Sequence, residues 1–185
     1  MVRGSSIRKD NMDLSHDDFL YKAFLAANDG GHIFPEHAAC EAALESGWGQ
    51  SKLAIEGNNL FGQKQSHPPI KGTQTLALPT EEYLKKQWVT VPANWVKFSR
   101  WGDCFRARME LLERLSDGYP HYAAALAATT GEDFTREVSV SWSTDPQRAA
   151  KVVAIHSAHQ ATLRRRINGE QSEAAGVKVS RGATL

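Results

Sequence analysis

The chain has 185 residues, of which 41% are hydrophobic and 23% are charged, and its formal net charge is +1. This length suits one domain with its own core, and the near-neutral charge gives no field that would draw the protein onto nucleic acid. No stretch approaches the roughly 20 apolar residues of a membrane span, and the first residues lack the apolar core of a secretory signal. We therefore predict a flexible leader at 1–13, a single domain at 14–168 and a flexible tail at 169–185, without membrane insertion or a nucleic-acid partner.

Three helices are predicted in the first third of the chain, at about 15–29, 35–45 and 51–56. Ser15 is a good N-cap for the first helix, because acidic residues follow it in the positive first turn. Pro35 suits the first turn of the second helix, which is rich in alanine. Such a helix can pack closely among others in the middle of the domain.

The middle of the chain, at about 62–98, changes character. Two runs rich in threonine, valine and aromatic residues, at 73–78 and 87–91, alternate well enough to predict a small antiparallel hairpin or sheet. Helical patterns then return at about 103–115, 119–128, 132–142 and 145–167. The sequence thus predicts a mostly α, α+β domain in which an α-lobe and a small β-lobe flank a cleft that suits a polymer.

The cysteines and histidines do not form a pattern with a chemical role. Cys40 and Cys104 are too few for a disulfide framework, and both fall in helical patterns, so we predict small buried thiols. His156 and His159 share a helix face but lack further ligands nearby in the sequence. The sequence predicts neither a metal site nor a cofactor.

Glu45 is the strongest candidate for a catalytic group. It lies in the last turn of an apolar helix, where the negative end of the helix dipole disfavours a carboxylate. Trp48 would add desolvation, and Glu41, one turn earlier, would add a like charge. These effects favour the protonated form that a general acid requires. The alternative is a solvated glutamate that ends a helix.

Two short segments carry a resemblance to a known family. Residues 43–49 read Ala-Leu-Glu-Ser-Gly-Trp-Gly, and residues 58–62 read Asn-Asn-Leu-Phe-Gly. Together they resemble the endo-β-N-acetylglucosaminidases of peptidoglycan, glycoside hydrolase family seventy-three, which includes autolysins, phage lysins and flagellar muralytic domains. Further similar segments follow in the family's order at 79–83, 95–112, 122–126 and 143–146. The resemblance spans about 19–167 and implies a lysozyme-like fold.

The resemblance also implies roles for individual residues. Glu45 takes the position of the general acid, and Glu82, just before Tyr83, takes that of a second carboxylate in the β-lobe. Glu81 is its neighbour, and alternation along an extended segment lets only one of the two face the cleft. The acetamido group of the substrate is a further alternative for the second role. The candidate substrate-binding residues are Trp48, Asn59, Phe61, Gln63, Tyr119, Tyr122 and Trp142.

One segment departs from the family pattern. Residues 141–145 read Ser-Trp-Ser-Thr-Asp where the family usually has Gly-Tyr-Ala-Thr-Asp. Trp142 keeps an aromatic face and an N–H donor but lacks a phenol hydroxyl. Either Trp142 cannot replace the phenol, or Tyr119 or Tyr122 supplies it from nearby.

The function implied is hydrolysis of the β-1,4 bond between N-acetylglucosamine and N-acetylmuramic acid in peptidoglycan glycan strands, by a monomer. One alternative is a lytic transglycosylase or muramidase of the same fold, and another is a catalytically inactive domain that binds peptidoglycan or acts as a scaffold. Because no signal peptide is visible, we expect synthesis in the cytoplasm. The protein would then reach the cell wall by holin-type release or through a secretion system.

Overall fold

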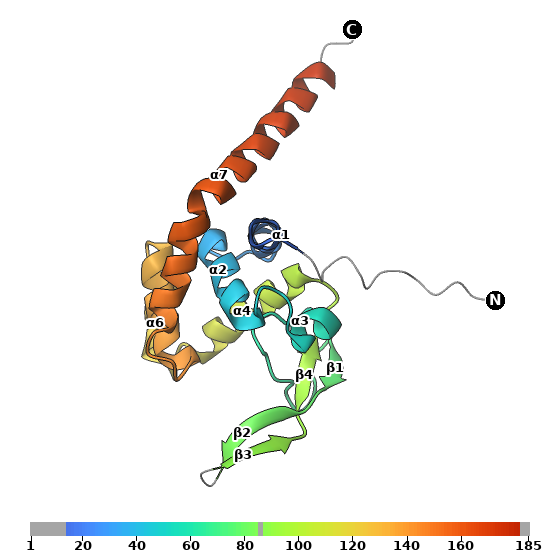
Figure 1. Ribbon diagram of the computed structural model, residues 1–185, viewed down its shortest axis with the longest axis vertical. Helices are drawn as coiled ribbons and strands as arrows, with labels where there is room; N and C mark the ends of the chain where they lie inside the picture. The colour runs from blue at the N-terminus through green and yellow to red at the C-terminus, as the bar shows by residue number, and fades with distance from the viewer. Residues whose placement is uncertain (1–13, 85–86, 182–185) are drawn as a thin grey trace, which may run out of the picture.

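The computed structural model describes residues 14–84 and 87–181, so the predicted leader at 1–13 lies outside the described residues. The helices are α1 (His16–Asp29), α2 (Pro35–Ser46), α3 (Lys52–Gly57), α4 (Trp101–Leu115), α5 (Pro120–Leu126), α6 (Gly131–Trp142) and α7 (Arg148–Arg181). The strands are β1 (Gln74–Ala77), β2 (Thr80–Leu84), β3 (Gln87–Val91) and β4 (Asn94–Lys97). The helices pack into one body, and the strands project from one end of it (Figure 1). The predicted mostly helical fold with a small antiparallel β-lobe is confirmed.

The first three helices begin where the sequence predicts. The Ser15 hydroxyl accepts a hydrogen bond from the backbone N–H of Asp18 at 3.1 Å, which satisfies a free donor of the first turn of α1. Ser51 caps α3 in the same way, through the N–H of Ala54 at 3.2 Å. Pro35 occupies the first turn of α2.

Helix α2 packs against α1, α6 and α7 and forms the centre of the helical body. Its buried alanines are Ala38, Ala39, Ala42 and Ala43. Because alanine has only a methyl side chain, the neighbouring helices can approach the α2 backbone closely. Cys40 on α2 and Cys104 on α4 are buried free thiols, as predicted, and burial raises the pKa of each to about 12.

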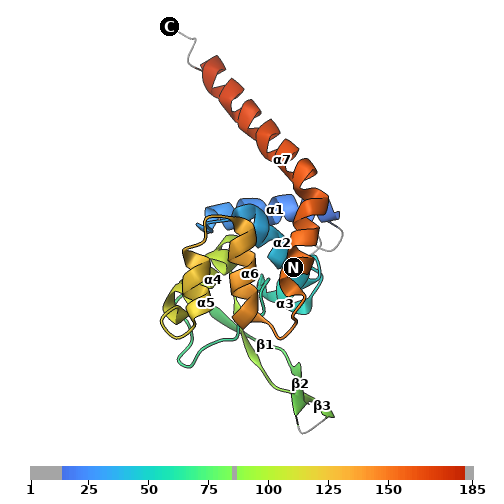
Figure 2. The ribbon, with the colours of Figure 1, turned by 90° about the vertical axis from the view of Figure 1, so that its left-hand side faces the viewer.

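The β-lobe differs from the predicted hairpin in its pairing. The two predicted runs form β1 and β3, but β1 pairs with β4 and β3 pairs with β2, both antiparallel. The chain therefore runs outward through β1 and β2 and returns through β3 and β4 (Figure 2). Pro79 and Pro92 lie between the two ladders, where a residue without an N–H cannot continue the pairing. The segment around Glu81 and Glu82 is extended, as expected, and forms β2, whereas β4 was not predicted.

Helix α7 is longer than predicted. The sequence predicts an end near residue 167 and a flexible tail from 169, whereas α7 continues to Arg181. The two glycines in this stretch, Gly169 and Gly176, each cost a helix only about 1 kcal/mol, and no proline follows to stop it. The last turns of α7 extend away from the helical body (Figures 1 and 2). Within the described residues, no helix combines the length and apolar character that crossing a membrane would require.

Candidate active site

The turn after α2 fixes the position of Glu45. Gly47, Trp48 and Gly49 all have positive φ, at 57°, 59° and 79°. The Ser46 hydroxyl donates to the carbonyl of Ala42 at 2.5 Å and accepts from the N–H of Gly49 at 2.8 Å. Glycine is favoured in this backbone region because it has no Cβ to clash with the adjacent carbonyl. The Ser-Gly-Trp-Gly sequence thus ends α2 abruptly and makes the last turn, which carries Glu45, rigid.

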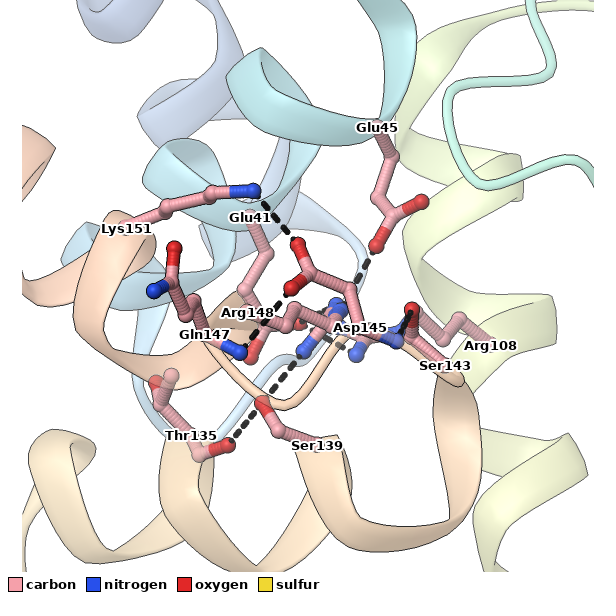
Figure 3. A network of polar contacts seen from close by, with 10 residues as sticks. All are labelled: Glu41, Glu45, Arg108, Thr135, Ser139, Ser143, Asp145, Gln147, Arg148 and Lys151. Atoms are coloured by element: carbon pink, nitrogen blue, oxygen red, sulfur yellow. Dashed lines mark hydrogen bonds and ion pairs between the residues drawn. The ribbon is translucent and has the colours of Figure 1, made fainter.

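Arg148, the first residue of α7, contacts Glu45 directly. Its Nε donates to Oε1 of Glu45 at 2.7 Å, and its Nη1 donates to the Ser139 hydroxyl at 2.8 Å. Its Nη2 lies 3.4 Å from Oε2 of Glu41 (Figure 3). The Arg148 side chain is 2% exposed and that of Glu45 is 25% exposed. One oxygen of Glu45 is therefore held by a buried cation, while part of the carboxylate remains accessible.

A second ion pair lies beneath this one. Glu41 pairs with Arg108 of α4, and both side chains are 0% exposed. The Arg108 guanidinium also lies 4.4 Å from the ring centroid of Phe61 and 4.7 Å from that of Trp142. Burial lowers the pKa of Arg108 below its ordinary value, and the neighbouring Glu41 carboxylate acts in the opposite direction. From the sequence, Glu41 was expected to act on Glu45 as a like charge. In the structure its charge is compensated by the guanidinium groups of Arg108 and Arg148.

The predicted aromatic residues divide between core and surface. Phe61 is buried, and Trp142 is partly buried with its ring 6.4 Å from that of Phe61. Tyr122 is also buried, and burial raises the pKa of its hydroxyl, while Arg108 and Arg148 act to lower it. Tyr122 belongs to an apolar cluster against which Trp142 packs. Tyr119, at the start of α5, is 47% exposed.

Trp48 lies in an aromatic cluster between α1 and α7. Its ring stacks on His16 at a centroid distance of 3.7 Å and meets the edges of Phe19 and His159. These contacts attach α7 to α1 and account for the tryptophan by packing. Trp48 is half-buried, and its role in sugar binding stays a prediction.

Asn59 and Gln63 belong to a structural joint between the loop after α3 and the β-lobe. The Asn59 amide donates to the carbonyls of Gln63 and Val96, both at 2.9 Å, and accepts from the N–H of Gln63 at 2.9 Å. Both side chains are buried. These three hydrogen bonds of the Asn59 side chain go to backbone groups, so the Asn-Asn-Leu-Phe-Gly segment connects the β-lobe to the helical body.

Glu82 lies in β2, where its backbone pairs opposite Val89. The β2–β3 ladder projects away from the helical body in both views (Figures 1 and 2). The structure places Glu82 on a different lobe from Glu45, and its role remains a prediction.

Arg108, Arg148 and Ser139 were not predicted from the sequence as residues of the site. A signal was present, because a glutamate within an alanine-rich central helix needs a buried partner. Arg108 stands in the apolar face of α4, where an unmatched cation would be costly. Elsewhere, residues 14–84 and 87–181 contain no group of three or more His, Cys, Asp or Glu that could hold a metal ion.

Solved structures share this fold. The catalytic domain of the autolysin Auto from Listeria monocytogenes is similar with a TM-score of 0.67 and 26% identity, over 80% of this chain and 86% of that one. The C-terminally truncated glycoside hydrolase domain of Salmonella typhimurium FlgJ is similar with a TM-score of 0.62 and 28% identity, over 80% and 99%. Fold and site together define a glycoside hydrolase domain of the lysozyme-like type.

The sequence comparisons are more specific. The family model described as Mannosyl-glycoprotein endo-beta-N-acetylglucosaminidase matches residues 21–161, so the chain belongs to this glucosaminidase family, as the resemblance predicted. Exo-glucosaminidase LytG of Bacillus subtilis is 30% identical over 142 residues, 76% of this chain and 46% of that protein. A probable N-acetylmuramidase of Lactococcus lactis subsp. cremoris is 31% identical over 141 residues, 72% and 31%. The chain spans less than half the length of the curated relatives it matches.

Proposed function

We propose that this chain hydrolyses the β-1,4 bond between N-acetylglucosamine and N-acetylmuramic acid in the glycan strands of peptidoglycan, with Glu45 as the general acid. The observation that carries the proposal is the placement of Glu45, a partly exposed carboxylate on a rigid helix end, beside a buried arginine. Membership of the glucosaminidase family supports the same bond.

The proposed chemistry needs a second group. Glu45 protonates the glycosidic oxygen as the bond breaks and the sugar develops oxocarbenium character. A base that activates water, or a nucleophile, then acts on the opposite face of the sugar ring. Glu82 is the proposed second carboxylate, with Glu81 or the substrate's acetamido group as alternatives.

A muramidase is the second candidate, and the names of the relatives favour it specifically. One relative is named an exo-glucosaminidase and another a probable N-acetylmuramidase, at nearly equal identity to this chain. The two activities cut alternate bonds of the same strand. A lytic transglycosylase would cut the muramidase bond but would leave an anhydro end in place of a reducing end.

The experiment identifies the new ends released from purified peptidoglycan. Wild type and Glu45→Gln are compared with Glu56→Gln, which changes an exposed glutamate on the neighbouring helix α3. The products are reduced and analysed by mass spectrometry. New N-acetylglucosamine reducing ends from wild type and Glu56→Gln, absent from Glu45→Gln, are the expected result.

Each other product pattern has its own meaning. New N-acetylmuramic acid reducing ends would favour the muramidase, and anhydromuramic ends would favour the transglycosylase. No products from folded wild type would favour a domain that only binds or acts as a scaffold. Full activity of Glu45→Gln would remove Glu45 from the proposed role.

A further inference from the structure

We propose that Arg148 is the positioning residue for Glu45, and that its guanidinium holds the Glu45 carboxyl group in the orientation that the reaction needs. This inference rests on the proposed function. Arg148 lies 103 positions from Glu45 in the chain and was not predicted from the sequence.

The guanidinium of Arg148 is fixed by contacts with two other helices. Glu45 and Glu41 lie on α2, and Ser139 lies on α6, where its hydroxyl donates to the carbonyl of Thr135 at 2.6 Å. A planar guanidinium with three separate contacts has little freedom to rotate. Oε1 of Glu45 therefore points in a direction set by the packing of α2, α6 and α7 (Figure 3).

Arg148 is paired more closely with Glu45 than with Glu41, because Glu41 has a second cation, Arg108. Arg108 already pairs closely with Glu41 in a fully buried contact. Arg148 lies 3.4 Å from Glu41 but 2.7 Å from Glu45, so its shorter contact is with the candidate acid. The arrangement contains two carboxylates and two guanidinium groups, which balance each other inside the domain.

The test compares kcat and KM on soluble glycan strands released from sacculi by an amidase. The variants are Arg148→Gln, Arg148→Lys and Ser139→Ala. The matched control is Arg136→Gln, which removes an exposed arginine that pairs with Glu132 and Asp133 of its own helix α6. Thermal unfolding of every variant is measured alongside.

Arg148→Gln should lower kcat at least tenfold and change KM less than threefold. Arg148→Lys should lower kcat several-fold but less than Arg148→Gln, since an ammonium group keeps the charge and cannot reproduce the three contacts. Arg136→Gln should behave as wild type.

A normal kcat in folded Arg148→Gln would overturn the proposal. If that variant does not fold, Ser139→Ala carries the test, because it releases only Nη1 of Arg148. It should lower kcat severalfold at unchanged KM, and an unchanged kcat would overturn the proposal. Loss of activity in Glu45→Gln together with a normal Arg148 series would leave the proposed function standing. An active Glu45→Gln would remove both.

Discussion

Glu41 and Arg108 form an ion pair in which neither side chain is exposed to solvent. The pair lies directly beneath the contact between Arg148 and Glu45, and Arg148 also reaches Glu41. Arg148 therefore connects the buried ion pair to the candidate active site. Any change in the buried pair should alter both stability and the orientation of Glu45.

Replacing Glu41 should destabilise the domain strongly. Glu41→Gln leaves two buried guanidinium groups with one carboxylate, and breaking a buried pair in this way typically costs about 3 kcal/mol or more. The control is Glu132→Gln, which breaks an exposed pair with Arg136 on α6 and should cost less than about 1 kcal/mol. Urea denaturation of both variants measures the difference. Equal losses would show that the buried pair is not an important source of stability.

Gly49 should tolerate alanine less well than Gly72, although both have φ near +80°. A Cβ at Gly49 would lie 2.9 Å from a ring carbon of buried Phe19, whereas a Cβ at Gly72 meets nothing within 4 Å. Gly72→Ala should therefore cost only the left-handed strain of about 1 kcal/mol, and Gly49→Ala about 3 kcal/mol. The free energy of unfolding of each variant tests this, and similar losses would contradict the steric argument.

Asn59→Ala should lower stability because the hydrogen bonds of the Asn59 amide go to backbone groups of Gln63 and Val96. Buried groups left without partners typically cost about 2 to 3 kcal/mol in total. Asn28→Ala, at an exposed position on α1, is the control and should change little. A raised KM in Asn59→Ala with an unchanged melting temperature would instead support the substrate-binding role that the sequence suggests.

His32 should make the domain less stable in mild acid. Burial, together with the nearby Arg108 charge, lowers the pKa of His32 from 6.5 to about 3. Between these values the unfolded chain binds a proton at His32 and the folded chain does not, so stability falls as the pH drops below about 6.5. At pH 5.5 the loss from this group should be about 1 kcal/mol relative to neutral pH.

The measurement is the free energy of unfolding from pH 5 to pH 7.5 for wild type, His32→Asn and His67→Asn. Asparagine can still accept the hydrogen bond that Nδ1 of His32 takes from the N–H of Phe34. His32→Asn should show a shallower pH dependence than wild type, and His67→Asn, at an exposed loop position, should not. Parallel curves for wild type and His32→Asn would contradict the prediction.

Local sequence patterns were sufficient for most helices. Ser15 and Ser51 cap the helices that they were predicted to begin, because a capping hydroxyl acts on an N–H only three residues away. The β-lobe was less predictable. Strand β1 pairs with β4 and β2 pairs with β3 because Pro79 and Pro92 divide one long antiparallel hairpin into two ladders. Runs of alternating residues do not specify their pairing partners.

The sequence by itself determined the family, the helical framework and the candidate acid Glu45, since these rest on short motifs and local periodicity. Only the tertiary structure decided what surrounds Glu45. Arg148 is 103 positions away from Glu45 and reaches it because α7 packs against α2. Trp48 and Asn59, which the sequence assigned to substrate, are occupied by packing and backbone hydrogen bonds. The contacts of a side chain depend on which helices meet, and that is set by burial of the whole core rather than by neighbours in the chain.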